Sequence, residues 1–140
     1  MSQLAELSEL LWRERQALDV LLFKLEEERL VLDAGRLEWL ARAGHEVELA
    51  AEELRLAGLA RAVGAEAVVE ELRLAPTATL AEIAAAAPTP WGEMFAAHRE
   101  AMLRLSARID ELAEANRRAV EAARDAAVRE ARTATGELIW

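Results

Sequence analysis

The two histidines, His45 and His98, are the side chains best suited to bind a metal ion or to transfer a proton. A carboxylate-bridged metal site in a helical bundle takes a Glu-x-x-His motif from each of two helices. The residue three positions before His45 is Arg42, and the one before His98 is Phe95, so neither fits this motif. Zinc would need further nitrogen or sulfur ligands, and the chain has no cysteine. We therefore expect neither a metal nor a cofactor, with His45 in solvent and His98 at or beside a helix seam.

The other polar residues form no pattern that is typical of catalysis. The sequence contains no G-x-x-x-x-G-K-[ST], G-x-G-x-x-G or G-x-S-x-G motif. Acidic runs such as Glu26-Glu27-Glu28 are usually the solvated face of a helix. The sequence therefore predicts a protein that is not an enzyme.

The composition indicates helices and excludes several classes of partner. Hydrophobic residues make up 54% of the 140 residues but aromatic residues only 4%, so the apolar content is mostly Ala and Leu. The net charge of −9 lacks the basic footprint of a nucleic-acid-binding protein. No apolar run approaches the roughly 18 residues of a membrane span, and the acidic N-terminus is unlike a signal peptide. We expect a cytoplasmic protein that binds no nucleic acid and does not insert into membranes.

A leucine seam predicts a first helix over residues 3–32. Its members lie seven residues apart or at the intermediate position of a coiled-coil seam: Leu4, Leu7, Leu11, Leu18, Leu21, Leu25 and Leu32. Glu14 and Glu28 occupy the remaining seam positions and interrupt it. We expect this seam to pack against the second helix and the first half of the last helix.

A second helix is expected over residues 35–63, after a turn at Asp33-Ala34-Gly35. Gly35 tolerates a positive φ, and Asp33 can accept N–H bonds from the start of the next helix. The apolar stripe of this helix widens near its end: Leu37, Leu40, Val47, Ala51, Leu54, Leu56, Leu59 and Val63. Gly64 is the expected stop. Trp12 and Trp39, one on each arm of this hairpin, are expected to pack between helices.

Residues 65–89 read as a connector that contains short helices. Thr79-Leu80-Ala81-Glu82 matches a capping box and opens a short helix that ends at about Ala87, before Pro88. Thr89 offers a second N-cap, with Pro90 at the first position of the last helix. Trp91 is expected to anchor this connector.

The last helix is expected over residues 90–133, followed by a tail over residues 134–140. At 1.5 Å per residue it would be about 65 Å long, against about 45 Å for the first helix, so about 20 Å would extend beyond the bundle. Asn116 interrupts its apolar stripe and either sets the register or the oligomeric state, or faces solvent at the bundle end. The tail Leu138-Ile139-Trp140 either docks within the chain or is offered to a partner.

The predicted fold is all-α, a single-domain elongated bundle or coiled coil of three long helices with a proline-containing connector.

The sequence resembles the FlgN family of flagellar export chaperones over about residues 4–132. The similarity lies in the leucine-rich acidic segment EEERLVLDAGRLEWLAR and in the proline-interrupted Ala/Leu connector that leads into a long last helix. That helix carries the pattern L-x-x-x-I-x-x-L-x-x-x-N, here Leu105, Ile109, Leu112 and Asn116. The middle of the chain is similar to the actinobacterial branch of the family.

This resemblance implies a chaperone that binds the C-terminal helical segments of hook–filament junction proteins, prevents early assembly and delivers them to the type III export apparatus. It implies that the last helix is the client-binding element, with these residues at the contact: Leu105, Ile109, Leu112, Asn116, Ala119, Val120, Ala123 and Ala127. It also implies contact with the export gate through an aromatic residue of the C-terminal region. This chain has no Tyr, and Trp140 lies past the expected helix end.

Two other functions stay open from the sequence. A generic coiled-coil oligomerisation or interaction module would self-associate and bind no helical client. A helical-bundle enzyme or metal protein would hold a metal that elemental analysis detects.

Overall fold

The computed structural model describes residues 2–139, with side chains described for residues 3–136. Its elements are α1 (Ser2–Asp33), the 3₁₀-helix η1 (Leu37–Trp39), α2 (Leu40–Glu71), α3 (Leu80–Ala86) and α4 (Trp91–Ile139). Residues 2–139 contain no strand, so the prediction of an all-α protein with three long helices and a short helix in the connector is confirmed. None of the described helices combines the length and apolar character of a membrane span.

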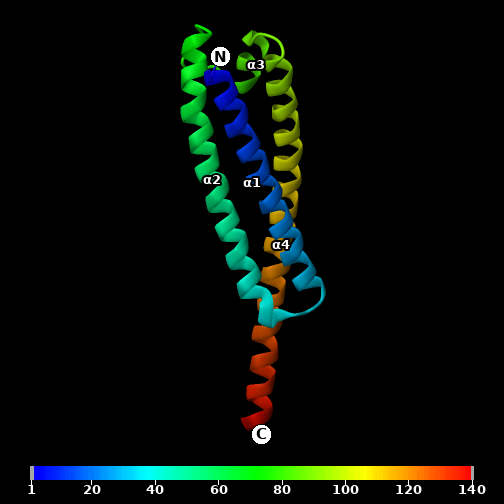
Figure 1. The fold of residues 1–140 in the computed structure, drawn as a ribbon. Helices are drawn as coiled ribbons and strands as arrows, with labels where there is room; N and C mark the ends of the chain where they lie inside the picture. The colour runs from blue at the N-terminus through cyan, green and yellow to red at the C-terminus, as the bar shows by residue number, and fades with distance from the viewer. Residues whose placement is uncertain (1, 140) are drawn as a thin grey trace.

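The helix α1 lies between α2 and α4 and packs along both (Figure 1). It runs antiparallel to α2 and parallel to α4, while α2 and α4 approach each other closely at few points. The short α3 packs against the first turns of α4, at the same end of the bundle as the N-terminus. We call this the upper end, and the end that holds the α1–α2 turn the lower end.

The leucine seam of α1 builds two apolar cores, as the sequence predicts. The upper core joins Leu4, Leu7 and Leu11 to Val68 and Val69 of α2, Ile83 of α3 and Phe95 of α4. The lower core joins Leu18, Leu21 and Leu25 to Ala50 of α2 and Ile109 of α4. Trp91 packs against the upper core, which confirms its predicted role as an anchor.

The turn after α1 is set by backbone bonds rather than by a side-chain cap. Gly35 has a φ of +68°, its N–H donates to the Leu32 carbonyl at 3.1 Å, and the Arg36 N–H donates to the Val31 carbonyl at 3.1 Å. This pair of bonds is a Schellman motif. The predicted capping role of Asp33 is wrong, because Asp33 ends α1 and pairs with Arg29 at 3.2 Å. The η1 turn then delays the start of α2 from residue 35 to Leu40.

The predicted stop of the second helix at Gly64 is also wrong, because α2 continues to Glu71. A Cβ atom at position 64 would lie 2.3 Å from Cδ1 of Leu10. Leu10 of α1 therefore packs directly on α2 at Gly64, and a single interior glycine costs a helix only about 1 kcal/mol relative to Ala, which does not end it. The helix ends instead in a second Schellman motif, in which Arg73 has a φ of +56° and the Leu74 N–H donates to the Val69 carbonyl at 2.9 Å.

The connector confirms the predicted capping box and corrects the second N-cap. The Glu82 N–H donates to Oγ1 of Thr79 at 3.2 Å, and the Thr79 N–H donates to Oε1 of Glu82 at 3.4 Å. At the start of α4 the Trp91 N–H donates to the Pro88 carbonyl at 2.8 Å, so backbone atoms rather than Thr89 satisfy the first turn. A Cβ atom on Gly92 would lie 2.6 Å from the Ala84 carbonyl oxygen, so this position lets α3 pack directly on α4.

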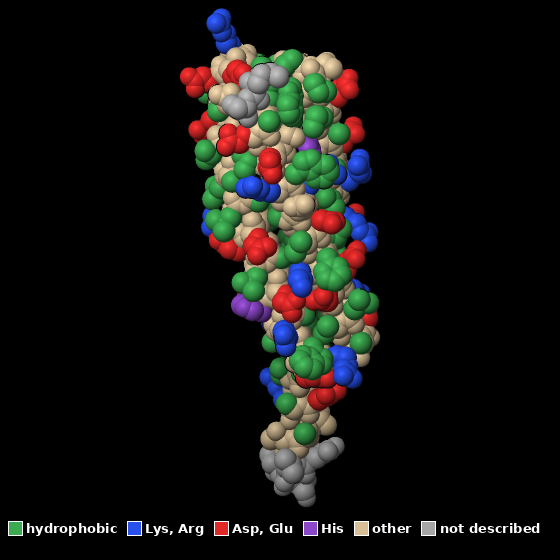
Figure 2. Space-filling view, viewed as in Figure 1, with side chains coloured by type: hydrophobic (Ala, Val, Ile, Leu, Met, Phe, Trp, Pro, Cys, Tyr) green, Lys and Arg blue, Asp and Glu red, His purple; other side chains and the backbone are tan. Residues whose placement is uncertain are grey.

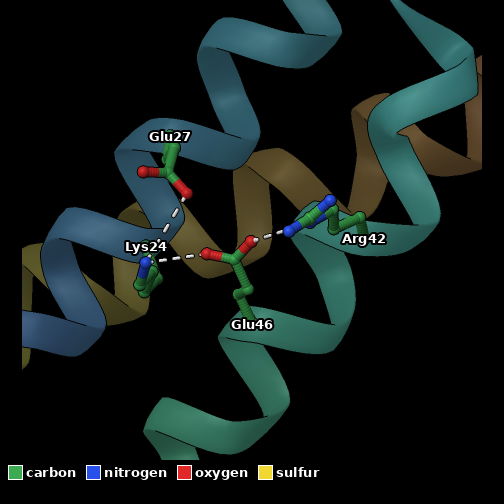
Figure 3. Close-up of polar contacts among 4 residues, drawn as sticks. All are labelled: Lys24, Glu27, Arg42 and Glu46. Atoms are coloured by element: carbon green, nitrogen blue, oxygen red, sulfur yellow. Dashed lines mark hydrogen bonds and ion pairs between the residues drawn. The ribbon is translucent and has the colours of Figure 1, made fainter.

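Polar contacts fasten α1 to α2 at two levels. The buried carboxylate of Glu14 accepts two bonds from the Arg61 guanidinium, at 2.7 and 3.2 Å. Nearer the turn, Lys24 donates to Glu46 at 2.7 Å and lies 3.7 Å from Glu27 (Figure 3). The hydrogen bond from Lys24 holds the pKa of Glu46 below its ordinary value, and the same bond raises the pKa of Lys24.

The last helix is longer than predicted and extends past the α1–α2 turn (Figure 1). Its 49 residues span about 74 Å, whereas the 32 residues of α1 span about 48 Å. The predicted end at residue 133 is wrong: the backbone stays helical through Gly136, since no proline follows to stop it. Whether the Leu138-Ile139-Trp140 tail docks on a surface falls outside the described side chains.

Replacing a leucine of the lower core should destabilise the whole bundle. We expect Leu18→Ala and Leu25→Ala each to lower the free energy of unfolding by roughly 2–5 kcal/mol, because each removes a buried side chain and leaves a cavity. Urea unfolding followed by circular dichroism measures this. Val20→Ala, at an exposed position of the same helix, is the matched control and should change stability by less than about 0.5 kcal/mol. Equal small effects at all three positions would contradict the described core.

Candidate functional site

The predicted client-binding residues on α4 fall into two groups in the structure. The upper four lie inside the bundle: Ile109 belongs to the lower core, Leu105 and Leu112 pack against it, and Asn116 is buried. The lower four lie near or beyond the end of the hairpin formed by α1 and α2. Ala119, Val120 and Ala123 are half-buried, and Ala127 is exposed. Ile109 and Asn116 are therefore out of reach of another protein, whereas the second group, like the half-buried Leu105 and Leu112, presents some surface.

The buried Asn116 lies between the two groups and bonds α4 to α1. Its side chain is 1% exposed, and Nδ2 donates to the Leu25 carbonyl at 2.9 Å and to Oε1 of Glu28 at 3.0 Å. Of the two interpretations open from the sequence, the structure shows the one in which Asn116 lies inside the seam and fixes α4 relative to α1. Its Oδ1 atom has no partner within the described residues.

A pocket lies where α4 leaves the bundle. This junction pocket has a volume of about 460 Å³ and is lined by residues of all three long helices and of η1: Glu28, Leu37, Leu40, Ala41, Gly44, His45, Glu48, Val120 and Arg124. Its lining combines apolar side chains with charged side chains of both signs. Two residues singled out from the sequence line this pocket, the half-buried Val120 and the exposed His45.

Below the junction pocket, α4 continues alone as the overhang, residues 125–139 (Figure 1). These 15 residues span about 22 Å. The face that continues downwards from the core carries small side chains at helical spacing: Ala119, Ala123, Ala126, Ala127 and Ala134. A shallow depression on this face is lined by Ala126, Glu130 and Ala134, among others. Small side chains leave room for a second helix axis to come close.

The charge of the molecule is divided between the hairpin and the last helix. Residues 2–71 hold sixteen acidic and eight basic side chains, which accounts for −8 of the net −9. Residues 117–132 hold five arginines against three acidic residues, a local excess of +2. In Figure 2 the lower part of the molecule accordingly shows basic side chains among acidic ones. This basic excess lies above the overhang, because residues 125–139 themselves hold two arginines against three acidic residues. An acidic partner would therefore be attracted to the stretch of α4 around the junction pocket and repelled by the hairpin.

The histidine of the seam belongs to a cluster that sequence reasoning did not find. His98 is 3% exposed, and Nη1 of Arg15 lies 3.1 Å from its Nδ1, which accepts the bond when the ring is neutral. The Arg15 guanidinium also covers the Trp12 ring at 4.4 Å, and the two rings of Trp12 and His98 meet edge to face at 4.8 Å. Trp12 thus contacts α4 through His98 but stays half exposed, and Trp39 is similarly exposed.

This cluster has the character of a structural contact. Burial, with a further contribution from the charge of Arg15, lowers the pKa of His98 below its ordinary value. No group of three or more potential metal ligands exists among the described residues. His98 is shielded from solvent by its neighbours, so no substrate would reach its ring.

The lowered pKa of His98 should make stability depend on pH. Above about pH 6.5 the histidine is neutral in both the folded and the unfolded chain, so it imposes no cost. Below that value the unfolded chain takes up a proton that the folded chain resists, so stability falls by up to about 1.4 kcal/mol per pH unit.

Urea unfolding at pH 7.5 and 5.5 measures this loss. We expect His98→Gln to lose less stability than the wild type over this interval, while His45→Gln, at an exposed histidine, behaves as the wild type. A wild-type loss equal to that of His98→Gln would contradict the buried neutral histidine.

The Asn116 contact predicts a second effect of charge. Asn116→Asp would place a buried carboxyl group against Glu28, and we expect the free energy of unfolding to fall by roughly 3–5 kcal/mol at pH 7. The loss should shrink at pH 4, where the pair retains a proton. Glu28→Gln in the Asn116→Asp background should recover much of it, because the amide can donate to the new carboxylate. The same loss in both backgrounds would show that Glu28 does not face position 116.

One of the comparisons with known proteins identifies a family. The family model described as FlgN protein matches residues 1–131, which include all of the hairpin, the connector and most of α4. No curated protein and no solved structure matches the chain significantly. The matched range ends within the overhang, and the match does not distinguish branches of the family.

Proposed function

The chain belongs to the FlgN family, whose members are non-enzymatic chaperones of flagellum biogenesis, and we propose that its clients are hook–filament junction proteins. In this proposal the chaperone binds the C-terminal helical segments of these proteins in the cytoplasm, keeps them from assembling early and delivers them to the type III export apparatus. The observation that carries the proposal is the overhang: 15 residues of helix with an apolar, small-residue face that nothing in the described chain covers.

We propose that the client helix lies along the overhang and ends in the junction pocket. Ala123 and Ala127 allow its axis to come close, and Val120 with Leu40 in the pocket supplies larger apolar contacts. A helix recognised in this way carries its own apolar anchors at i, i+3, i+4 and i+7. Leu105, Ile109, Leu112 and Asn116 contribute indirectly, because they hold α4 on the bundle and thereby direct the overhang.

Two finer features of the proposal rest on the sequence. The proline-interrupted connector supports the actinobacterial type of the family. The resemblance implies a gate contact through an aromatic residue of the C-terminal region, and Trp140 is the only aromatic residue after Phe95.

A coiled-coil oligomerisation module remains the second candidate, because the overhang face would accept a second copy of the chain as readily as a client. Sedimentation velocity separates the two candidates. A chain that stays monomeric at micromolar concentration and binds a client peptide supports the chaperone. A stable oligomer that binds no peptide supports the module.

A charge on the overhang face should weaken client binding without affecting the fold. We expect Ala127→Glu to lower the affinity for a peptide from the C-terminus of a junction protein at least tenfold, about 1.4 kcal/mol, as measured by calorimetric titration. The residue is exposed, so the melting temperature should not change.

The matched control is Val128→Glu, an exposed apolar residue about 100° further around the same helix. It should bind the peptide with nearly wild-type affinity. Equal affinities for the wild type and Ala127→Glu would move the client site away from this face.

A further inference from the structure

The outer face of α2 carries a row of large apolar side chains that no element covers. Leu49, Leu56, Leu59 and Val63 are 52–67% exposed. They lie on the side of α2 that faces away from α1, since the residues of α2 that do enter the cores, such as Ala50 and Val68, lie on the opposite side of the helix. In Figure 2 apolar and acidic side chains are interspersed along the left edge of the molecule, which is the outer side of α2.

This row repeats the pattern of the α1 seam position by position. Adding 38 to each residue number of the α1 series Leu11, Glu14, Leu18, Leu21, Leu25 and Glu28 gives the α2 series Leu49, Glu52, Leu56, Leu59, Val63 and Glu66. Both series therefore have two glutamates 14 residues apart with three large aliphatic residues between them. The α1 copy is buried except for the half-buried Glu28, whereas the α2 copy faces solvent.

The contacts of the α1 copy show what such a seam binds. Leu11 enters the upper core, and Leu18, Leu21 and Leu25 enter the lower core, where they meet residues of two neighbouring helices. Each of its glutamates accepts hydrogen bonds from a side chain on one of those helices. Arg61 of α2 binds Glu14 through two bonds, and Nδ2 of Asn116 on α4 binds Glu28 at 3.0 Å. The seam thus packs on apolar helices, and each of its two glutamates is satisfied by a donor on one of them.

We propose that the outer face of α2 is a docking site for a basic amphipathic helix of a second protein, distinct from the client. Such a helix places aliphatic residues against Leu56, Leu59 and Val63 and a basic side chain opposite each of Glu52 and Glu66. Because the two glutamates are 14 residues apart, the two basic side chains lie about 21 Å apart along the partner. The proposal concerns a surface on the opposite side of the hairpin from α4, so it does not depend on the proposed function.

The charge around the row selects this partner over others. The helix α2 holds seven acidic and three basic side chains, a net −4, and Glu48, Glu53 and Glu70 flank the row. In the free chain Glu52 pairs with Arg55 of its own helix at 2.6 and 3.0 Å. An exposed ion pair of this kind contributes little to stability, so a basic side chain of the partner can replace Arg55. A second copy of α2 would bring two such acidic faces together, and an anionic lipid surface would be repelled.

The test uses the full chain and two synthetic peptides. Each peptide is a helical 24-residue segment with leucines at seam positions and neutral residues elsewhere. The first has two arginines 14 residues apart, and its twin has glutamates in their place. Calorimetric titration should show that the wild type binds the arginine peptide at least tenfold more tightly than the glutamate twin. Charge reversal by Glu52→Arg with Glu66→Arg should invert this preference.

The apolar part of the site needs its own matched control. Leu56→Ser with Leu59→Ser should weaken binding of the arginine peptide at least tenfold, whereas Leu103→Ser, at an equally exposed leucine on α4, should leave it unchanged. The melting temperature checks that each variant is folded. Binding of the junction-protein peptide should be unaffected in all of them, which separates this test from that of the client site.

Three results would overturn the proposal. One is equal affinity for the two peptides, or equal loss in the Leu56/Leu59 and Leu103 variants. Another is concentration-dependent self-association that disappears in Leu56→Ser with Leu59→Ser, which would make a second copy the occupant. The last is binding to anionic phospholipid vesicles that needs the same two leucines, which would make the surface a membrane contact.

Discussion

Burial of the α1 leucine seam is the interaction on which the rest of the structure depends. The helix α1 contacts both other long helices, while those two touch each other little, so neither α2 nor α4 would have a fixed position without it. The seam therefore has to satisfy two neighbours at once. It does so with leucines in both cores and with two glutamates. One glutamate accepts hydrogen bonds from Arg61 of α2, and the other accepts one from Asn116 of α4. Because those polar partners fit only one arrangement, they select the register that the leucines alone leave open.

The periodic features of this fold could be predicted from the sequence, because they depend on neighbours along the chain. The leucine seam of α1 and the capping box of Thr79 and Glu82 are local patterns, and both were found where they were expected. The features that were missed depend on contacts between distant residues. Gly64 reads as a helix stop until Leu10 is placed against it, and Asp33 reads as a cap until the Schellman turn satisfies the same backbone groups.

The candidate site was predictable only in part for the same reason. The excess length of the last helix follows from counting residues, but the level at which it leaves the bundle depends on how α4 aligns with α1. Asn116 and Ile109 therefore lie inside, although the sequence places them in one stripe with Ala123 and Ala127. Likewise Leu56, Leu59 and Val63 read as a widening of the core stripe of α2. A sequence shows that a helix has two apolar faces, but only the number of available neighbours decides which face is covered.

The overhang has a consequence for how easily a partner can use it. An isolated helix of about 15 residues is marginal in water, because its first turn must form at an entropic cost before any later hydrogen bond is gained. In this protein that nucleus already exists, since α4 is fixed by packing up to the level of Asn116 and Val120. Each further residue only extends a formed helix. The binding face is thus presented in helical form at the cost of propagation alone, whereas the same residues cut out as a peptide would be mostly unstructured.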